Sequence, residues 1–226
     1  MKPEFFIKDL KETAARWLPF MEAAEMPVPD KDEVLGCGMY GCAFGSEDPD
    51  ILVKYTTSRD EAEFMHAQKE IRISGIVSVH LVLKLGRVGF LIWRDRLDTC
   101  CEVAVRSLLI QHDLPYERFD QLVEQRRAHD AWEASVYGKA LWKNYESLLR
   151  KGEKETIQEG CTRIAEVPGM RDLANGLMDI AEYDLFLSDM HIKNVGRFKS
   201  YDQLVVFDGQ PTGDTRMLGE YPIPEV

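Results

Sequence analysis

The sequence predicts an α+β fold of two lobes, a small lobe of five antiparallel strands with one helix and then a mainly helical lobe. Short apolar runs separated by turn residues predict the strands across residues 33–94. Apolar side chains at helical spacing dominate residues 103–183. A chain of 226 residues can bury such a core. We expect an N-terminal helical extension over 1–29, the small lobe over 30–97 and the helical lobe over 98–226.

The elements of the small lobe follow one another closely. Apolar spacing predicts a helix over 8–24, which Pro27 ends. Strands are predicted near 33–37, 41–46, 50–56, 79–86 and 88–94. Ser58 and Glu61 form a capping box that predicts a helix over about 59–73. A later helix over about 169–183 leads toward a polar loop.

A glycine-rich loop lies between the first two strands and contains Gly36, Gly38 and Gly41. Residues without side chains let the backbone close over a polyphosphate, with N–H groups directed at it. Lys54 follows Gly36 by 18 residues within the third apolar run. It would supply a fixed positive charge to the same phosphates. Loops need glycines in any case, so the lysine is what strengthens the phosphate interpretation.

A second group of polar residues lies far downstream. Asp189 is followed five residues later by Asn194, and Asp208 closes an apolar run 14 residues after that. Asn194 and Asp208 are oxygen ligands of the kind that Mg²⁺ takes. Asp189 is placed to accept a hydroxyl proton or to orient a nucleophile.

In this order the motifs resemble those of the protein-kinase-like superfamily, which includes Ser/Thr/Tyr kinases and the aminoglycoside and choline kinases. The glycines fit G-x-G-x-x-G, and Lys54 fits the lysine of the third strand. Asp189 and Asn194 fit the catalytic-loop D-x-x-x-x-N, and Asp208 fits the aspartate of D-F-G. The match spans residues 34–210. It implies a two-lobed kinase-like fold with ATP and Mg²⁺ as cofactors.

The sequence also departs from the family pattern. Leu187 and Ser188 replace the histidine and arginine before the catalytic aspartate, and the run from Asp208 to Gln210 replaces D-F-G. His191 is closer to the D-x-H-x-x-N of small-molecule and atypical kinases, although it could also only support its loop. We therefore expect no activation by phosphorylation of a loop after Asp208.

The resemblance also implies a glutamate that pairs with Lys54 from the helix after Ser58. Glu63 and Glu70 lie on one face of that helix, two turns apart. We favour Glu70, because its position leaves about four helical turns between it and Lys54. The alternative is that both are solvent-facing charges.

Composition limits the partners. The formal net charge of −11 argues against nucleic-acid binding. No apolar run approaches the roughly 20 residues of a membrane span, and the start has no signal-peptide core. The five cysteines form no C-x-x-C pair, so we expect free thiols, a cytoplasmic location and no zinc site.

The sequence thus predicts a kinase that moves the γ-phosphate of ATP to a hydroxyl of a protein Ser/Thr or of a small molecule. Adenine should lie against a hinge near residues 93–97. Residues 103–160, together with the short tail after Asp208, should form the acceptor-side wall. A pseudokinase that binds a nucleotide or a partner without turnover remains an alternative, favoured by the altered D-F-G. Transfer of AMP instead of phosphate is a third hypothesis, which no motif supports specifically.

Overall fold

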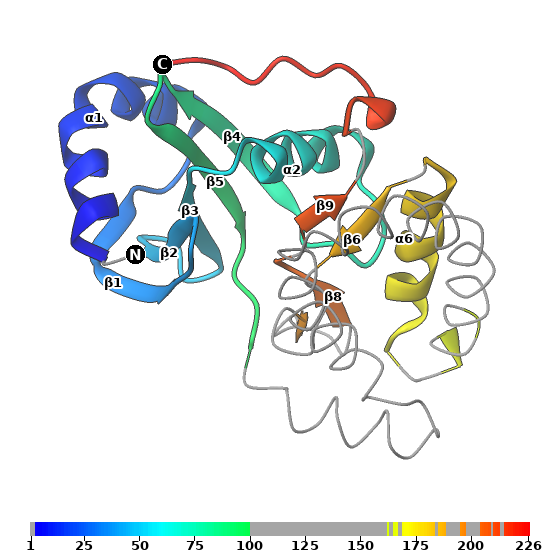
Figure 1. Cartoon of the computed structure of the whole chain (residues 1–226). Coiled ribbons are helices and arrows are strands. Elements are labelled where there is room, and N and C mark those ends of the chain that lie inside the picture. The colour runs from blue at the N-terminus through cyan, green and yellow to red at the C-terminus, as the bar shows by residue number, and fades with distance from the viewer. Residues whose placement is uncertain are drawn as a thin grey trace, which may run out of the picture. The chain divides into compact units, whose positions relative to one another are not determined.

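The structure, a computed structural model, describes residues 3–99, 162, 165–166, 169–183, 185–188, 195–197, 204–208, 210–212 and 215–226. The chain divides into two compact units (Figure 1). The first unit comprises Met1–Arg72, Val77–Leu97 and Gly213–Val226, and the second comprises Ile73–Ile76 and Asp98–Thr212. The helices and the acceptor wall expected between residues 103 and 160 lie outside the described residues.

The first unit contains two helices and a five-stranded antiparallel sheet. Helix α1 spans Pro3–Ala24 and helix α2 spans Arg59–Ile71. The strands are β1 (Pro29–Cys37), β2 (Gly41–Ser46), β3 (Ile51–Thr56), β4 (Val79–Leu85) and β5 (Gly89–Asp95). Their order in the sheet is β1-β2-β3-β5-β4. The predicted α+β class and five-stranded antiparallel sheet are therefore confirmed.

The sheet lies between the two helices. Alternate residues of a strand point to opposite faces of a sheet, so β3 contacts one helix on each face. Val53 and Tyr55 of β3 belong to one fully buried apolar cluster with side chains of α1. The α1 members of that cluster are Phe6, Leu10, Trp17 and Met21. Lys54 and Thr56, one residue out of phase, point to the other face, where both contact a side chain of α2.

A polar contact also joins α1 to β3. The hydroxyl of Tyr55 lies 3.0 Å from the Asp9 carboxylate and 2.8 Å from the Val88 carbonyl oxygen. Burial, followed by the hydrogen bond to Asp9, raises the pKa of Tyr55 above its ordinary value, so the phenol stays neutral. Helix α1 is thus part of the same core as the sheet.

Helix α2 begins and ends with defined caps. The Ser58 hydroxyl accepts a hydrogen bond of 3.3 Å from the Glu61 N–H, as the capping box predicts. At the other end Arg72 adopts a left-handed conformation with φ of +54°, and its N–H donates to the Gln68 carbonyl at 2.9 Å. The helix therefore ends close to where the sequence predicted.

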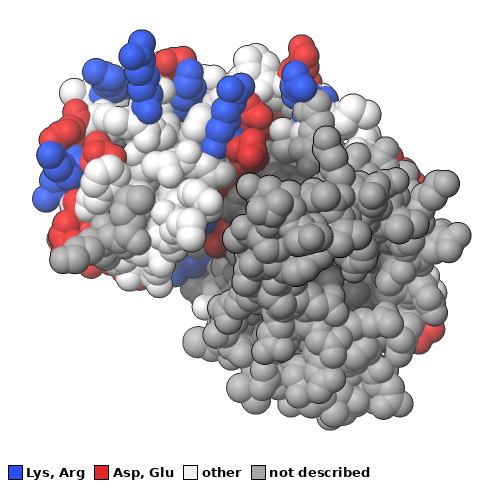
Figure 2. All heavy atoms as spheres, in the orientation of Figure 1, with Lys and Arg blue, Asp and Glu red and all other residues white. Residues whose placement is uncertain are grey.

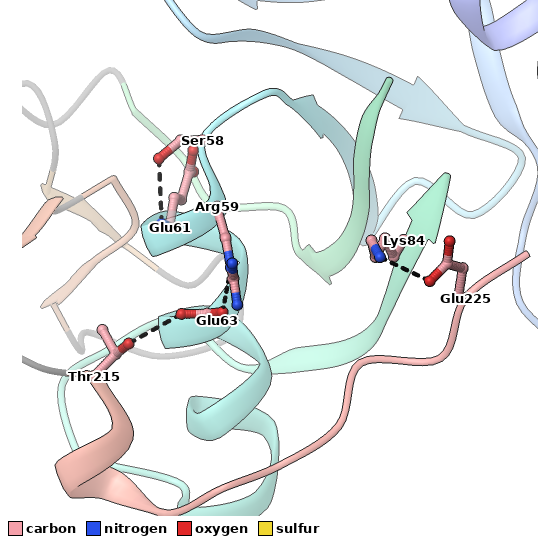
Figure 3. A network of polar contacts seen from close by, with 7 residues as sticks. All are labelled: Ser58, Arg59, Glu61, Glu63, Lys84, Thr215 and Glu225. Atoms are coloured by element: carbon pink, nitrogen blue, oxygen red, sulfur yellow. Dashed lines mark hydrogen bonds and ion pairs between the residues drawn. The ribbon is translucent and has the colours of Figure 1, made fainter. Parts of the chain in front are cut away.

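The tail, residues 215–226, returns to the first unit and lies along α2. It opens with a short 3₁₀ helix, η2 (Thr215–Leu218), where the Thr215 hydroxyl donates to Glu63 at 3.3 Å (Figure 3). Further along, the His66 ring lies 3.2 Å from the Pro222 carbonyl oxygen through Nε2. Burial, and then the nearby Lys69 charge, lower the pKa of His66, so the ring is neutral and can donate there.

The end of the tail adds a short parallel bridge to the edge of β4. The Lys84 N–H donates to the Pro224 carbonyl at 2.8 Å, and the Val226 N–H donates to the Lys84 carbonyl at 2.9 Å. An ion pair of 2.7 Å between Lys84 and Glu225 accompanies the bridge (Figure 3). The tail covers part of a sheet edge that would otherwise present unpaired backbone groups.

The second unit contains Asp208, the described member of the downstream polar group. It contains α6 (Arg171–Glu182) and the strands β6 (Phe186–Ser188), β7 (Val195–Arg197), β8 (Leu204–Val206) and β9 (Gln210–Thr212). Strands β6 and β9 pair, as do β7 and β8, both antiparallel. Gly75 has a φ of +69°, and an added Cβ there would collide with the Leu173 backbone. This close packing, together with a 2.8 Å bond from the Val206 N–H to the Gly75 carbonyl, holds β8 in place.

Leu10→Ala should lower the free energy of unfolding by about 2–5 kcal/mol, since it removes a fully buried side chain from the α1–sheet core. Phe20→Ala is the matched control on the same helix, because Phe20 is 45% exposed, and it should cost less than about 1 kcal/mol. Urea denaturation followed by circular dichroism measures both. Equal losses would contradict the packing of α1 on the sheet.

Candidate nucleotide site

The glycine-rich loop closes the hairpin between β1 and β2. Gly36 pairs with Ala43 in the strand register, and the Gly38 N–H donates to the Gly41 carbonyl at 2.8 Å. A Cβ added to Gly36 or Gly38 would meet no described atom within 4 Å, whereas one added to Gly41 would collide with the Tyr55 carbonyl. Gly41 is thus required by packing. Gly36 and Gly38 border open space, which is what a backbone cradle for phosphates needs.

The two cysteines beside this loop form a disulfide, which corrects the expectation of free thiols for this pair. Cys37 and Cys42 are register partners in β1 and β2, with their Cα atoms 4.1 Å apart. The register of the hairpin brings the two cysteines together, and this register cannot be predicted from the number and spacing of cysteines. Disulfides persist mainly in oxidising compartments, so the cytoplasmic location remains a prediction only. Cys100, Cys101 and Cys161 lie outside the described residues.

Lys54 lies in the strand next to the loop. It pairs with Ala43 of β2 and Ile92 of β5, and it is only 9% exposed. Its Nζ lies 2.6 Å from Oε1 of Glu61, whose side chain is 1% exposed. The first unit therefore buries a cation together with one carboxylate beside the glycine-rich loop.

The Glu61 carboxylate has partners on both oxygens. Oε1 faces Lys54, and Oε2 accepts a 2.8 Å hydrogen bond from the fully buried Thr56 hydroxyl. Glu61 is the third residue of α2, one turn after the cap residue Ser58 (Figure 3). The positive end of the helix dipole also favours a carboxylate at this position.

This ion pair corrects the predicted partner of Lys54. Glu70 is 40% exposed in its side chain and pairs with Lys69 at 2.6 Å, which lowers the pKa of Glu70. At about 100° per residue, Glu63 and Glu70 lie roughly 200° and 180° around α2 from Glu61. Both candidates therefore share the face turned away from Lys54. The correct glutamate, Glu61, belongs to the capping box, a motif that predicts the start of a helix and does not indicate a lysine partner.

The hinge expected near residues 93–97 has most of its backbone donors in use. The N–H groups of Asp95 and Arg96 donate to Ser78 and Asp50 at 3.1 and 2.7 Å. The Leu97 N–H has no hydrogen-bond partner within the described part of the chain.

In the second unit, Asp208 follows β8 by two residues and is half-buried. Asp189, Asn194 and His191 lie outside the described residues, so their predicted roles remain predictions. Among the described residues no three His, Cys, Asp or Glu side chains cluster as a metal site.

The described surface carries both signs of charge. Figure 2 shows Lys and Arg side chains standing beside Asp and Glu side chains over the first unit, without one continuous basic area on this face. Within the described residues, no helix has both the length and the apolar character of a membrane span.

Two solved structures resemble this one at low similarity. No protein-family model and no curated protein matches the sequence. The structure is similar to the GDP and kanamycin complex of APH(2")-IIia, with a TM-score of 0.33 and 13% identity over 78% of this chain and 65% of that chain. It is similar to the GDP complex of a mutant aminoglycoside 2'-phosphotransferase IIIa, with a TM-score of 0.33 and 12% identity over 78% of this chain and 64% of that one. This chain thus spans just under two thirds of the structures that it matches. A likeness this low does not place the chain in a family.

Glu61→Gln should lower the free energy of unfolding by about 3 kcal/mol, because it leaves the buried Lys54 ammonium without a carboxylate. The double variant Lys54→Met with Glu61→Gln should regain most of that loss, since it removes both charges. Glu70→Gln is the control and should leave the denaturation midpoint unchanged. If Glu70→Gln were the costlier change, the Lys54–Glu61 assignment would be wrong.

Reduction of the Cys37–Cys42 disulfide should lower the free energy of unfolding by about 2 kcal/mol, the loss expected for a short cross-linked loop. Denaturation with and without dithiothreitol measures it. Cys37→Ser should show the same loss and no further response to the reductant. A reductant response that survives in Cys37→Ser would assign the effect to other cysteines.

Proposed function

We propose that the chain is an ATP- and Mg²⁺-dependent phosphotransferase of the protein-kinase-like superfamily. The observation that carries the proposal is the buried Lys54–Glu61 pair in the strand beside the glycine-rich loop. A lysine held by a carboxylate is a fixed cation for nucleotide phosphates, and the open space at Gly36 and Gly38 leaves room for them.

The adenine base would bind the hinge backbone at Leu97. The neighbouring N–H groups of Asp95 and Arg96 already have partners, and the Leu97 N–H has none among the described residues. Adenine recognition by one backbone donor and nearby carbonyls needs no particular side chain, which fits the absence of a hinge motif in the sequence.

Asp208 and Asn194 would bind Mg²⁺, and Asp189 would orient the acceptor hydroxyl. These roles come from the order and spacing of the motif residues. The metal would neutralise charge on the phosphates, and the hydroxyl of a protein Ser/Thr or of a small molecule would receive the γ-phosphoryl group.

A pseudokinase is the second candidate, because Gly209 and Gln210 stand where D-F-G has phenylalanine and glycine. That candidate shares the nucleotide site and lacks turnover. Labelled ATP separates the two: movement of a γ-label to an acceptor supports the kinase, binding without movement supports the pseudokinase, and movement of an α-label indicates transfer of AMP.

ATP with Mg²⁺ should raise the melting temperature, because a ligand that binds only the folded state stabilises it. At a free concentration of about 100 Kd the gain is about 2.7 kcal/mol. Lys54→Met should remove most of this shift. Lys69→Met changes a half-buried lysine of α2 that pairs with Glu70 and not with Glu61, and the shift should be retained in this variant.

Asp208→Asn should reduce the dependence of the shift on Mg²⁺, and Asp189→Asn should abolish transfer while nucleotide binding persists. Calorimetric titration of each variant measures binding apart from stability. No shift for the wild type at millimolar ATP with Mg²⁺ or Mn²⁺ would contradict the proposed function.

A further inference from the structure

Thr56 lies where three parts of the candidate site meet. It pairs with Gly41 at the end of the glycine-rich loop, and it is two residues after Lys54 on the same face of β3. The next residue, Thr57, donates to the Tyr40 carbonyl of the loop through its N–H at 2.7 Å and through its hydroxyl at 3.0 Å. Thr56 itself is fully buried.

The Thr56 hydroxyl has both its donor and an acceptor site in use. A carboxylate can only accept, so the hydroxyl proton must point to Glu61 Oε2, 2.8 Å away. The hydroxyl oxygen in turn accepts from the Ser58 N–H at 3.1 Å. A buried hydroxyl is costly without such partners, so an apolar β-branched residue would otherwise suit this fully buried strand position.

These bonds change how the capping box works. In an ordinary capping box the third-residue glutamate turns back to the N–H of the cap residue. Here Thr56 accepts the Ser58 N–H instead, and the Glu61 carboxylate reaches β3. Thr56 therefore satisfies the helix terminus and leaves Glu61 available for Lys54.

We propose that Thr56 is a positioning residue of the nucleotide site, which holds the Glu61 carboxylate so that the Lys54 ammonium is fixed for phosphate binding. This inference rests on the proposed function for its role in binding. The placement of Glu61 itself rests only on three contacts: Thr56 with Glu61, Thr56 with the Ser58 N–H, and Glu61 with Lys54.

Thr56→Val keeps the shape of the side chain and removes the hydroxyl. It should weaken ATP–Mg²⁺ binding about tenfold, the size expected when a hydrogen bond to a charged group is lost. Thr56→Ser restores the hydroxyl and should bind within about twofold of the wild type. Thr13→Val is the matched control, since Thr13 is a buried threonine of α1 whose hydroxyl donates to the Asp9 carbonyl at 2.7 Å. It should leave binding unchanged.

Calorimetric titration gives the affinities, and denaturation gives a second measurement without nucleotide. In denaturation, the effects of Thr56→Val and Lys54→Met on stability should be non-additive. The unfolding equilibrium constant of the double variant should differ by more than about twofold from the value that the two single variants predict by multiplication. If the wild type binds no nucleotide but this coupling is present, the proposed function and the role of Thr56 in binding both fail, and only the placement of Glu61 by Thr56 stands. Additive effects, wild-type affinity in Thr56→Val, or an equal affinity loss in Thr13→Val would overturn the positioning role.

Discussion

The buried ion pair of Lys54 and Glu61 is the interaction on which the first unit's architecture depends. Two charges removed from water destabilise a fold unless each has a partner at close range. Lys54 lies in the middle strand of the sheet, and Glu61 lies in the first turn of α2. The ion pair between them therefore sets the distance between β3 and the start of α2. Thr56 and the Ser58 cap fix the helix start at that separation.

The surrounding elements hold both ends of this pair. On one face, α1 packs on β3 through the apolar cluster and through the contact of Tyr55 with Asp9. On the other, the tail contacts α2 at Glu63 and His66 and then pairs with β4. A cation that is held this firmly has little freedom left to lose when a ligand binds, which is the physical advantage of preorganisation.

Local patterns predicted the elements, and contacts distant in sequence decided the rest. Alternating apolar runs and the Ser58 cap gave five strands and α2, because strand and cap signals are local. The rotation around α2 decides which glutamate meets Lys54. Distance along the helix favours Glu70, but Glu70 lies on the face of α2 opposite to Glu61. The Cys37–Cys42 bond depends on hairpin register, and the return of the tail to β4 depends on tertiary packing. Neither leaves a periodic signal in the sequence.

The most direct measurement is a crystal structure of the chain with a non-hydrolysable ATP analogue and Mg²⁺. We expect phosphate oxygens within hydrogen-bond distance of the Lys54 ammonium and of the backbone N–H groups of the glycine-rich loop, with Glu61 still paired to Lys54. A nucleotide bound away from this loop, or Lys54 paired with Glu70 in the complex, would contradict it.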